Sequence, residues 1–105
     1  MGSISVACYK PRPGQEEALL ELVRDHMTPL RSQNLVADRK PIIMRTQDGT
    51  IVEVFEWVPG AVARAHANPA VLALWGHYAE ACEIVPLTSL AEASSMFASF
   101  IPIDL

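Results

Sequence analysis

The chain has 105 residues, half of them hydrophobic and 19% charged, and this length suits one globular domain spanning residues 1–105. Twelve acidic residues stand against eight basic ones and no run of like charges occurs, which argues against a nucleic-acid-binding surface and a basic membrane-binding patch. The partners we expect are therefore a small molecule or another protein.

The start of the chain lacks the apolar stretch of a signal peptide, and no later run of residues is long and apolar enough to span a bilayer. We therefore expect a cytoplasmic protein that has no membrane partner. Cys8 and Cys82 form no CxxC pattern and accompany no paired histidines, so they predict two buried thiols and no metal site.

The first part of the chain predicts a strand and then a helix. Residues 3–9 are free of helix or strand breakers, and the turn-forming residues 10–14 follow them. Residues 15–33 predict one amphipathic helix, because apolar residues recur at helical spacing and acidic residues occupy its first turn. The apolar positions are Leu19, Leu22, Val23, Met27 and Leu30. Residues 34–41 are polar, end in proline and predict a loop.

The middle of the chain predicts a β-hairpin. Residues 41–46 and 51–58 are apolar, β-branched runs, and Asp48-Gly49 between them is a strong turn signal. The two strands should therefore pair in antiparallel fashion.

The last third predicts a broken helix, a loop and a final strand. Residues 61–83 are alanine-rich, but Asn68-Pro69 inside them is typical of an N-cap followed by proline in the first helical turn. We therefore expect a break at that point. Residues 86–95 predict a loop with one short turn, and residues 96–103 predict the last strand.

The predicted order β-α-β-β-α-β indicates an α+β domain of the ferredoxin-like class, in which two helices cover one face of a four-stranded antiparallel sheet. Alternate residues of a strand point to opposite faces, and both faces of the strand at residues 51–58 are mainly apolar, as are those of the strand at 96–103. Two helices cover only one face, and a bare apolar sheet is rare on a monomer. We therefore expect a homodimer that packs through the exposed sheet face.

A family resemblance rests on Trp57 at the end of the third strand, on His66, and on Asn68-Pro69 opening a stretch that continues to Trp75. This pattern resembles the dimeric α+β barrel superfamily, and within it the antibiotic biosynthesis monooxygenase-like domains. The resemblance implies a pocket between sheet and helices in each subunit. Members use that pocket for cofactor-free oxygenation of polycyclic phenols, for isomerisation or for haem degradation, and some have no identified activity. Trp75 stands where the haem degraders carry their ligating histidine, so we expect no haem and no other cofactor.

Two histidines are candidates for proton transfer. His66 follows an alanine-rich stretch one turn after Val62, and a pocket-facing imidazole there is a candidate catalytic proton shuttle. The alternative is a hydrogen-bonded histidine that caps the first half of the broken helix. His26 lies in the apolar stripe between Val23 and Leu30 and either faces the same pocket or extends toward solvent.

The remaining candidates are substrate-binding residues. Phe55 and Trp57 on one strand face, with Trp75 and Tyr78 on the helix, suit a cavity for a flat aromatic ligand, although such residues also form ordinary cores. Glu53 shares that strand face. Its expected partner is Arg45 across the hairpin, and without one its burial would make it a candidate base. Tyr9 is a further polar candidate.

Three functions remain open from the sequence. The first is a cofactor-free, monooxygenase-like enzyme that acts on an apolar aromatic compound, with His66 as the proton shuttle. The second is a non-catalytic ligand-binding or structural dimer module, in which the same residues only form the core. The third is an isomerase of a small metabolite. Hydrolase, nucleotide-binding and zinc-protease motifs do not occur in the sequence.

Overall fold

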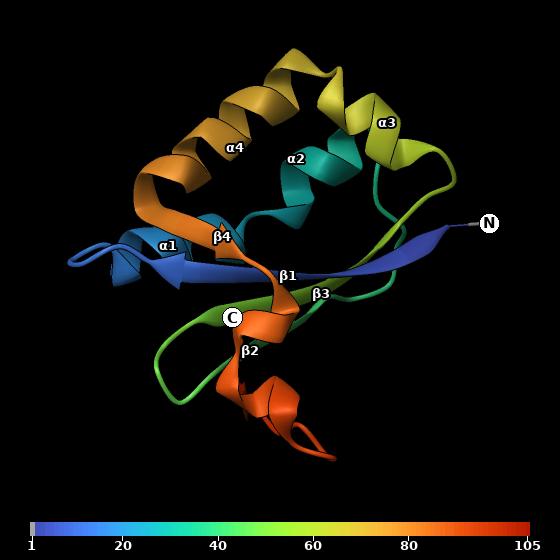
Figure 1. The fold of residues 1–105 in the computed structure, drawn as a ribbon. Helices are drawn as coiled ribbons and strands as arrows, with labels where there is room; N and C mark the ends of the chain where they lie inside the picture. The colour runs from blue at the N-terminus through green and yellow to red at the C-terminus, as the bar shows by residue number, and fades with distance from the viewer. Residues whose placement is uncertain (1) are drawn as a thin grey trace.

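The computed structural model describes residues 2–105, and Met1 of the predicted domain lies outside the described residues. Over this range the chain has an α+β fold built on a five-stranded antiparallel sheet with the order β4-β1-β3-β2-β5. Helices lie above one face of the sheet, and the segment that follows β4 lies below the other (Figure 1). None of the helices in residues 2–105 is both long and apolar enough to cross a membrane.

The two central strands, β1 (Ser3–Pro11) and β3 (Ile51–Trp57), pair along most of their length. Their register runs from Ser3 opposite Trp57 to Tyr9 opposite Ile51. β1 is two residues longer than predicted, because its last four residues pair with a different strand, β4.

The predicted hairpin is confirmed. β2 (Ile42–Arg45) and β3 are joined by a turn in which the Thr46 amide donates to the Thr50 carbonyl at 2.9 Å. Gly49 has a φ of 94°, a left-handed conformation that suits glycine. The turn therefore sets Arg45 opposite Ile51 and Ile43 opposite Glu53.

The single helix predicted over residues 15–33 is wrong, because two helices stand there. α1 (Glu16–Arg24) and α2 (Met27–Ser32) are separated at Asp25 and His26. Pro29 supplies the reason: it has no N–H to donate to the Asp25 carbonyl four residues earlier, and its ring crowds that carbonyl. The break turns His26 into the interior, where it is buried.

The predicted break at Asn68-Pro69 is confirmed. Two residues separate α3 (Ala61–His66) from α4 (Pro69–Ala81). The Asn68 side chain accepts from the amides of Ala70 and Val71 at 2.9 and 3.3 Å, and Pro69 occupies the first helical position.

The predicted last strand over residues 96–103 is wrong. The fourth strand, β4 (Cys82–Val85), follows α4 without a loop and pairs with β1, whereas β5 is only Ile101–Pro102. The predicted helix over residues 61–83 included the first two residues of β4, Cys82 and Glu83, and the prediction assigned Ile84 and Val85 to no element. Met96 and Phe97 are 92% and 84% exposed, so the proposed two-faced apolar strand does not exist there.

The helices cover one face of the sheet and leave the other partly bare. On the far face, Cys8 and Val52 pack against Leu90, which lies between the short 3-10 helices η1 (Leu87–Ser89) and η2 (Ala91–Ser94). The remainder of that face carries an apolar row across three strands, since Val6 is paired with Val54 and Val54 with Ile42. Val6 and Ile42 are 43% and 59% exposed.

Candidate functional site

A polar network lies in the core between the sheet and the helices. Glu53, near the middle of β3, has no exposed surface. Its Oε1 accepts the Tyr9 hydroxyl at 2.8 Å and lies 2.7 Å from Nδ1 of His26. The sheet register explains the first contact, because it sets the small Ala7 opposite Glu53 and places Tyr9 two residues along β1 on the same face.

Hydrogen-bonding roles in this network follow from its geometry. Burial and the nearby Glu53 carboxylate raise the pKa of Tyr9 well above its usual range, so Tyr9 keeps its proton and donates it. The carboxylate oxygen also faces His26 Nδ1, which assigns the Nδ1–H form to the imidazole. Nε2 is then the nitrogen that carries the lone pair in neutral His26.

Three buried polar atoms in this region have no hydrogen-bond partner in the described part of the chain. They are Nε2 of His26, Oε2 of Glu53 and the hydroxyl of Tyr78. Most buried polar atoms in proteins are paired, so three unpaired ones in one small region require an explanation. A polar group that comes from outside the chain would satisfy them.

Aromatic rings enclose the imidazole. The His26 ring lies 5.0 Å from that of Tyr78 and 5.7 Å, edge-on, from that of Phe55, measured between centroids. Phe55 in turn lies 5.1 Å from Trp57, whose indole donates to the Ser5 hydroxyl. Five of the predicted site residues are therefore brought together, namely His26, Glu53, Phe55, Trp57 and Tyr78.

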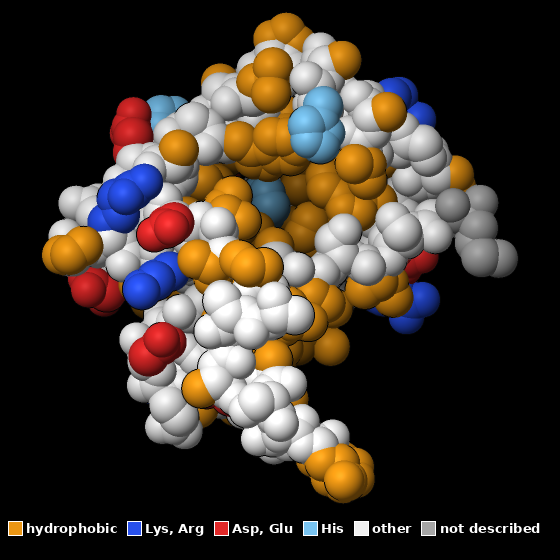
Figure 2. Space-filling model, in the orientation of Figure 1, with side chains coloured by type: hydrophobic (Ala, Val, Ile, Leu, Met, Phe, Trp, Pro, Cys, Tyr) orange, Lys and Arg blue, Asp and Glu red, His pale blue; other side chains and the backbone are white. Residues whose placement is uncertain are grey.

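A hollow opens beside this cluster. β4 covers β1 only over its last four residues, so the edge of β1 over residues 3–7 has no neighbouring strand on that side among residues 2–105. Figure 2 shows the hollow between the helices and the sheet, with mainly hydrophobic walls and histidine atoms at its floor. An apolar concave surface with a few polar groups is the usual form of a small-molecule site.

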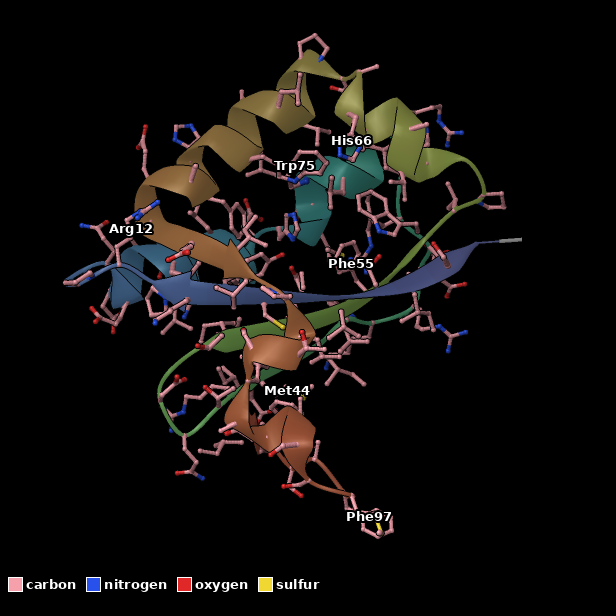
Figure 3. The ribbon with its side chains drawn as sticks, viewed as in Figure 1. Arg12, Met44, Phe55, His66, Trp75 and Phe97 are labelled. Carbon is pink, nitrogen blue, oxygen red and sulfur yellow. The ribbon has the colours of Figure 1, made fainter. Side chains whose placement is uncertain are left out.

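The rings of His66, at the end of α3, and Trp75, in the middle of α4, lie side by side above Phe55 on the sheet (Figure 3). Their rings are 5.2 Å apart and meet edge to face. His66 is exposed, and its Nδ1 lies 2.8 Å from the Val62 carbonyl, which can only accept. This contact fits the alternative of a histidine that caps α3. Trp75 is half-buried and packs against the core.

The predicted Arg45–Glu53 pair is wrong. Both side chains belong to the same face of the sheet, but the turn sets Arg45 opposite Ile51, and Arg45 is exposed. It lines a separate groove together with Glu16 and Gly49. Glu53 is therefore neither paired with arginine nor alone, because Tyr9 and His26 occupy its Oε1.

Other surface features lie away from the network. One groove runs between α1 and α4, and a second lies where β2 meets the C-terminal residues. Neither is lined by His26 or Glu53. In residues 2–105, no three His, Cys, Asp or Glu side chains are grouped as a metal site requires.

Stability at alkaline pH should report on the two buried tyrosines. Burial, with a further contribution from Glu53, raises the pKa of both Tyr9 and Tyr78. An unfolded tyrosine loses its proton near pH ~10, so above that pH the folded state holds more protons than the unfolded state. We expect the free energy of unfolding to fall by about 1.4 kcal/mol per pH unit for each tyrosine.

Urea unfolding at several pH values above ~10 measures this slope, and Tyr78→Phe is the matched variant. It lacks one of the two groups, so its free energy of unfolding should fall less steeply than that of the wild type by about 1.4 kcal/mol per pH unit. Equal slopes for the two proteins would show that Tyr78 ionises equally easily in the folded and unfolded chains.

Comparison of the chain with protein-family models, with curated protein sequences and with solved structures found no match in any of the three.

Proposed function

We propose that this protein is an enzyme in which His26, oriented by Glu53, removes a proton from an apolar aromatic molecule bound in the hollow. One observation carries the proposal: Nδ1 of His26 is held 2.7 Å from the buried carboxylate, while Nε2 has no partner in the described structure. A carboxylate that fixes the tautomer of a histidine and stabilises its protonated form is a common arrangement for a general base.

We assign proton transfer to His26 rather than to His66. His66 is exposed and directs Nδ1 to a neutral backbone carbonyl of its own helix, and in the described part of the chain it makes no ion pair with a carboxylate. His26 has such a group in Glu53, and it lies among the aromatic rings that suit a flat ligand.

The base serves two reactions equally well. Removing a proton from a phenol or an enol leaves an electron-rich anion. A phenolate either adds O₂ at a ring carbon and takes up a proton to form a hydroperoxide, which loses water and leaves a quinone, or the anion takes up a proton at another carbon. The first course is cofactor-free oxygenation and the second is isomerisation. We favour the monooxygenase-like course, because the resemblance to the antibiotic biosynthesis monooxygenase-like domains supports it, and we keep the isomerase as the alternative.

We also propose that the fold is ferredoxin-like and that two copies form a dimeric α+β barrel. The order β4-β1-β3-β2, with all four α-helices on one face, supports this assignment. The row Val6, Val54 and Ile42 on the other face supports the dimer, because an apolar surface of this kind is costly to leave in water.

The test compares His26→Gln with His66→Gln. Purified protein without added metal or flavin is incubated with polycyclic phenols in D₂O, and both O₂ consumption and exchange of ring hydrogens are followed. We expect His26→Gln to lose about 100-fold or more of either activity, a typical contribution of a general base. His66→Gln should stay within a few-fold of the wild type.

Two results would contradict the proposal. If His66→Gln lost activity while His26→Gln retained it, the base would be His66. If the wild-type protein bound phenols but neither consumed O₂ nor exchanged their hydrogens, it would be a non-catalytic binding module. Circular dichroism and urea unfolding of both variants show whether a loss reflects misfolding.

A further inference from the structure

We infer that the Tyr78 hydroxyl and Nε2 of His26 together select ligands that carry a ring hydroxyl, with Tyr78 as the donor that orients it. This inference deepens the proposed function and rests on it. The group that the site recognises is a ring hydroxyl, and Tyr78 binds it in addition to packing in the core.

The two side chains come from different elements and lie close together. Tyr78 comes from α4 and His26 from the break between α1 and α2, and their ring centroids lie 5.0 Å apart with an angle of 53° between the ring planes. The ring of Tyr9, on β1, packs against that of Tyr78 with 4.9 Å between the centroids, while the Tyr9 hydroxyl donates to Glu53. Both the Tyr78 hydroxyl and His26 Nε2 are buried and have no partner in the part of the chain that is described.

The chemistry of these two atoms is complementary to a hydroxyl. Burial raises the pKa of Tyr78, so its O–H stays protonated and remains a donor, whereas neutral His26 offers a lone pair at Nε2. A phenolic hydroxyl accepts from Tyr78 and donates to Nε2 at the same time. An ether or a ketone satisfies only Tyr78, and a hydrocarbon satisfies neither.

The same contacts account for proton transfer. The proton moves from the ligand oxygen to Nε2, and no other bond changes. The resulting phenolate then accepts two hydrogen bonds, from Tyr78 and from the Nε2–H of His26, while Glu53 balances the charge of the imidazolium. Hydrogen bonds to charged groups are stronger than neutral ones, so the pair stabilises the phenolate more than the phenol.

Access to these atoms requires movement of the side chains around them. Neither atom has measurable exposed surface, although the hollow reaches the histidine atoms at its floor. Half-buried Trp75 lies in the helix layer above the sheet, and its ring meets that of exposed His66 edge to face. A ring that enters the hollow meets the two polar atoms once these aromatic side chains shift.

A buried hydroxyl without a partner lowers the stability of a fold. Tyr78→Phe keeps the ring and removes only that hydroxyl, so the variant should be at least as stable as the wild type in urea at pH 7. A clear loss of stability would mean that the hydroxyl is already satisfied within the protein, and it would overturn the inference.

The binding test uses 1-naphthol and naphthalene as probes in isothermal titration calorimetry. We expect the wild type to prefer 1-naphthol, and Tyr78→Phe to weaken 1-naphthol binding roughly five- to tenfold, as expected for one hydrogen bond. Naphthalene binding should be unchanged. His77→Gln is the matched control, because His77 precedes Tyr78 on α4 but is exposed and lines the separate groove between α1 and α4, so the preference for the hydroxyl should stay in place.

Failure of the inference and failure of the proposed function give different results. If Tyr78→Phe binds 1-naphthol as well as the wild type does, or if His77→Gln loses the preference equally, Tyr78 does not select the hydroxyl. The same conclusion follows if the wild type binds neither probe. If the Tyr78-dependent preference is present but His26→Gln leaves hydrogen exchange unchanged, the inference stands and the assignment of the base fails.

Discussion

Replacing Glu53 by alanine should lower the free energy of unfolding by about 3–5 kcal/mol, the usual cost of removing one partner from a buried polar pair. The substitution leaves the Tyr9 hydroxyl and Nδ1 of His26 buried without an acceptor, and it opens a cavity in the middle of β3. Urea denaturation at pH 7, followed by circular dichroism, measures the loss.

Glu53→Gln is the matched control. Glutamine fills nearly the same volume, and its amide oxygen accepts the same two hydrogen bonds, so the variant should lose only about 1–2 kcal/mol, the contribution of the charge to those bonds. Since the amide cannot balance an imidazolium at His26, this variant should fold and yet lose proton transfer. Equal destabilisation by Ala and Gln would show that the hydrogen bonds contribute little to stability.

Placing carboxylates in the bare apolar row should break the proposed dimer. Val6→Asp combined with Ile42→Asp puts two charges on each copy, and a symmetric interface doubles that number. Taking each charge out of water costs several kcal/mol, so the dissociation constant should rise by about 100-fold or more. Analytical ultracentrifugation over a range of protein concentrations measures it.

The control for this experiment is Leu72→Asp. Leu72 is 48% exposed, comparable to Val6, but it belongs to α4 in the helix layer on the opposite side of the sheet. Its substitution should leave the dissociation constant unchanged. A wild-type protein that sediments as a monomer at high concentration, or a Leu72→Asp variant that dissociates as readily as the double variant, would contradict the proposed interface.

Local signals in the sequence predicted the parts of the fold that short-range chemistry decides. Asp48-Gly49 determines the hairpin and Asn68-Pro69 the helix break, because each acts through hydrogen bonds or backbone angles within a few residues. The strand that pairs with the edge of β1 is decided by long-range contacts. Either residues 82–85 or the predicted strand at residues 96–103 had to fill that position. Residues 82–85 occupy that edge because α4 delivers them there directly, and helical periodicity cannot show this.

The site was predicted in part for the same reason. Strand alternation placed Glu53, Phe55 and Trp57 on one face, and the structure agrees. The predicted partner of Glu53, Arg45, was wrong. Counting residues outward from the hairpin turn would have shown this, because it sets Arg45 opposite Ile51. The contact with His26 depends on where the first helix breaks, and Pro29 was the available signal.

Because the polar network lies on β1 and β3, substitutions in the strands should be tolerated less well than substitutions in the helices. Glu53 and Tyr9 belong to the two central strands, so a substitution that alters the base also weakens the fold. The roof of the hollow comes from α3 and α4, where exposed positions tolerate substitution. Divergence toward new ligands should therefore accumulate in the helices while the strand residues persist.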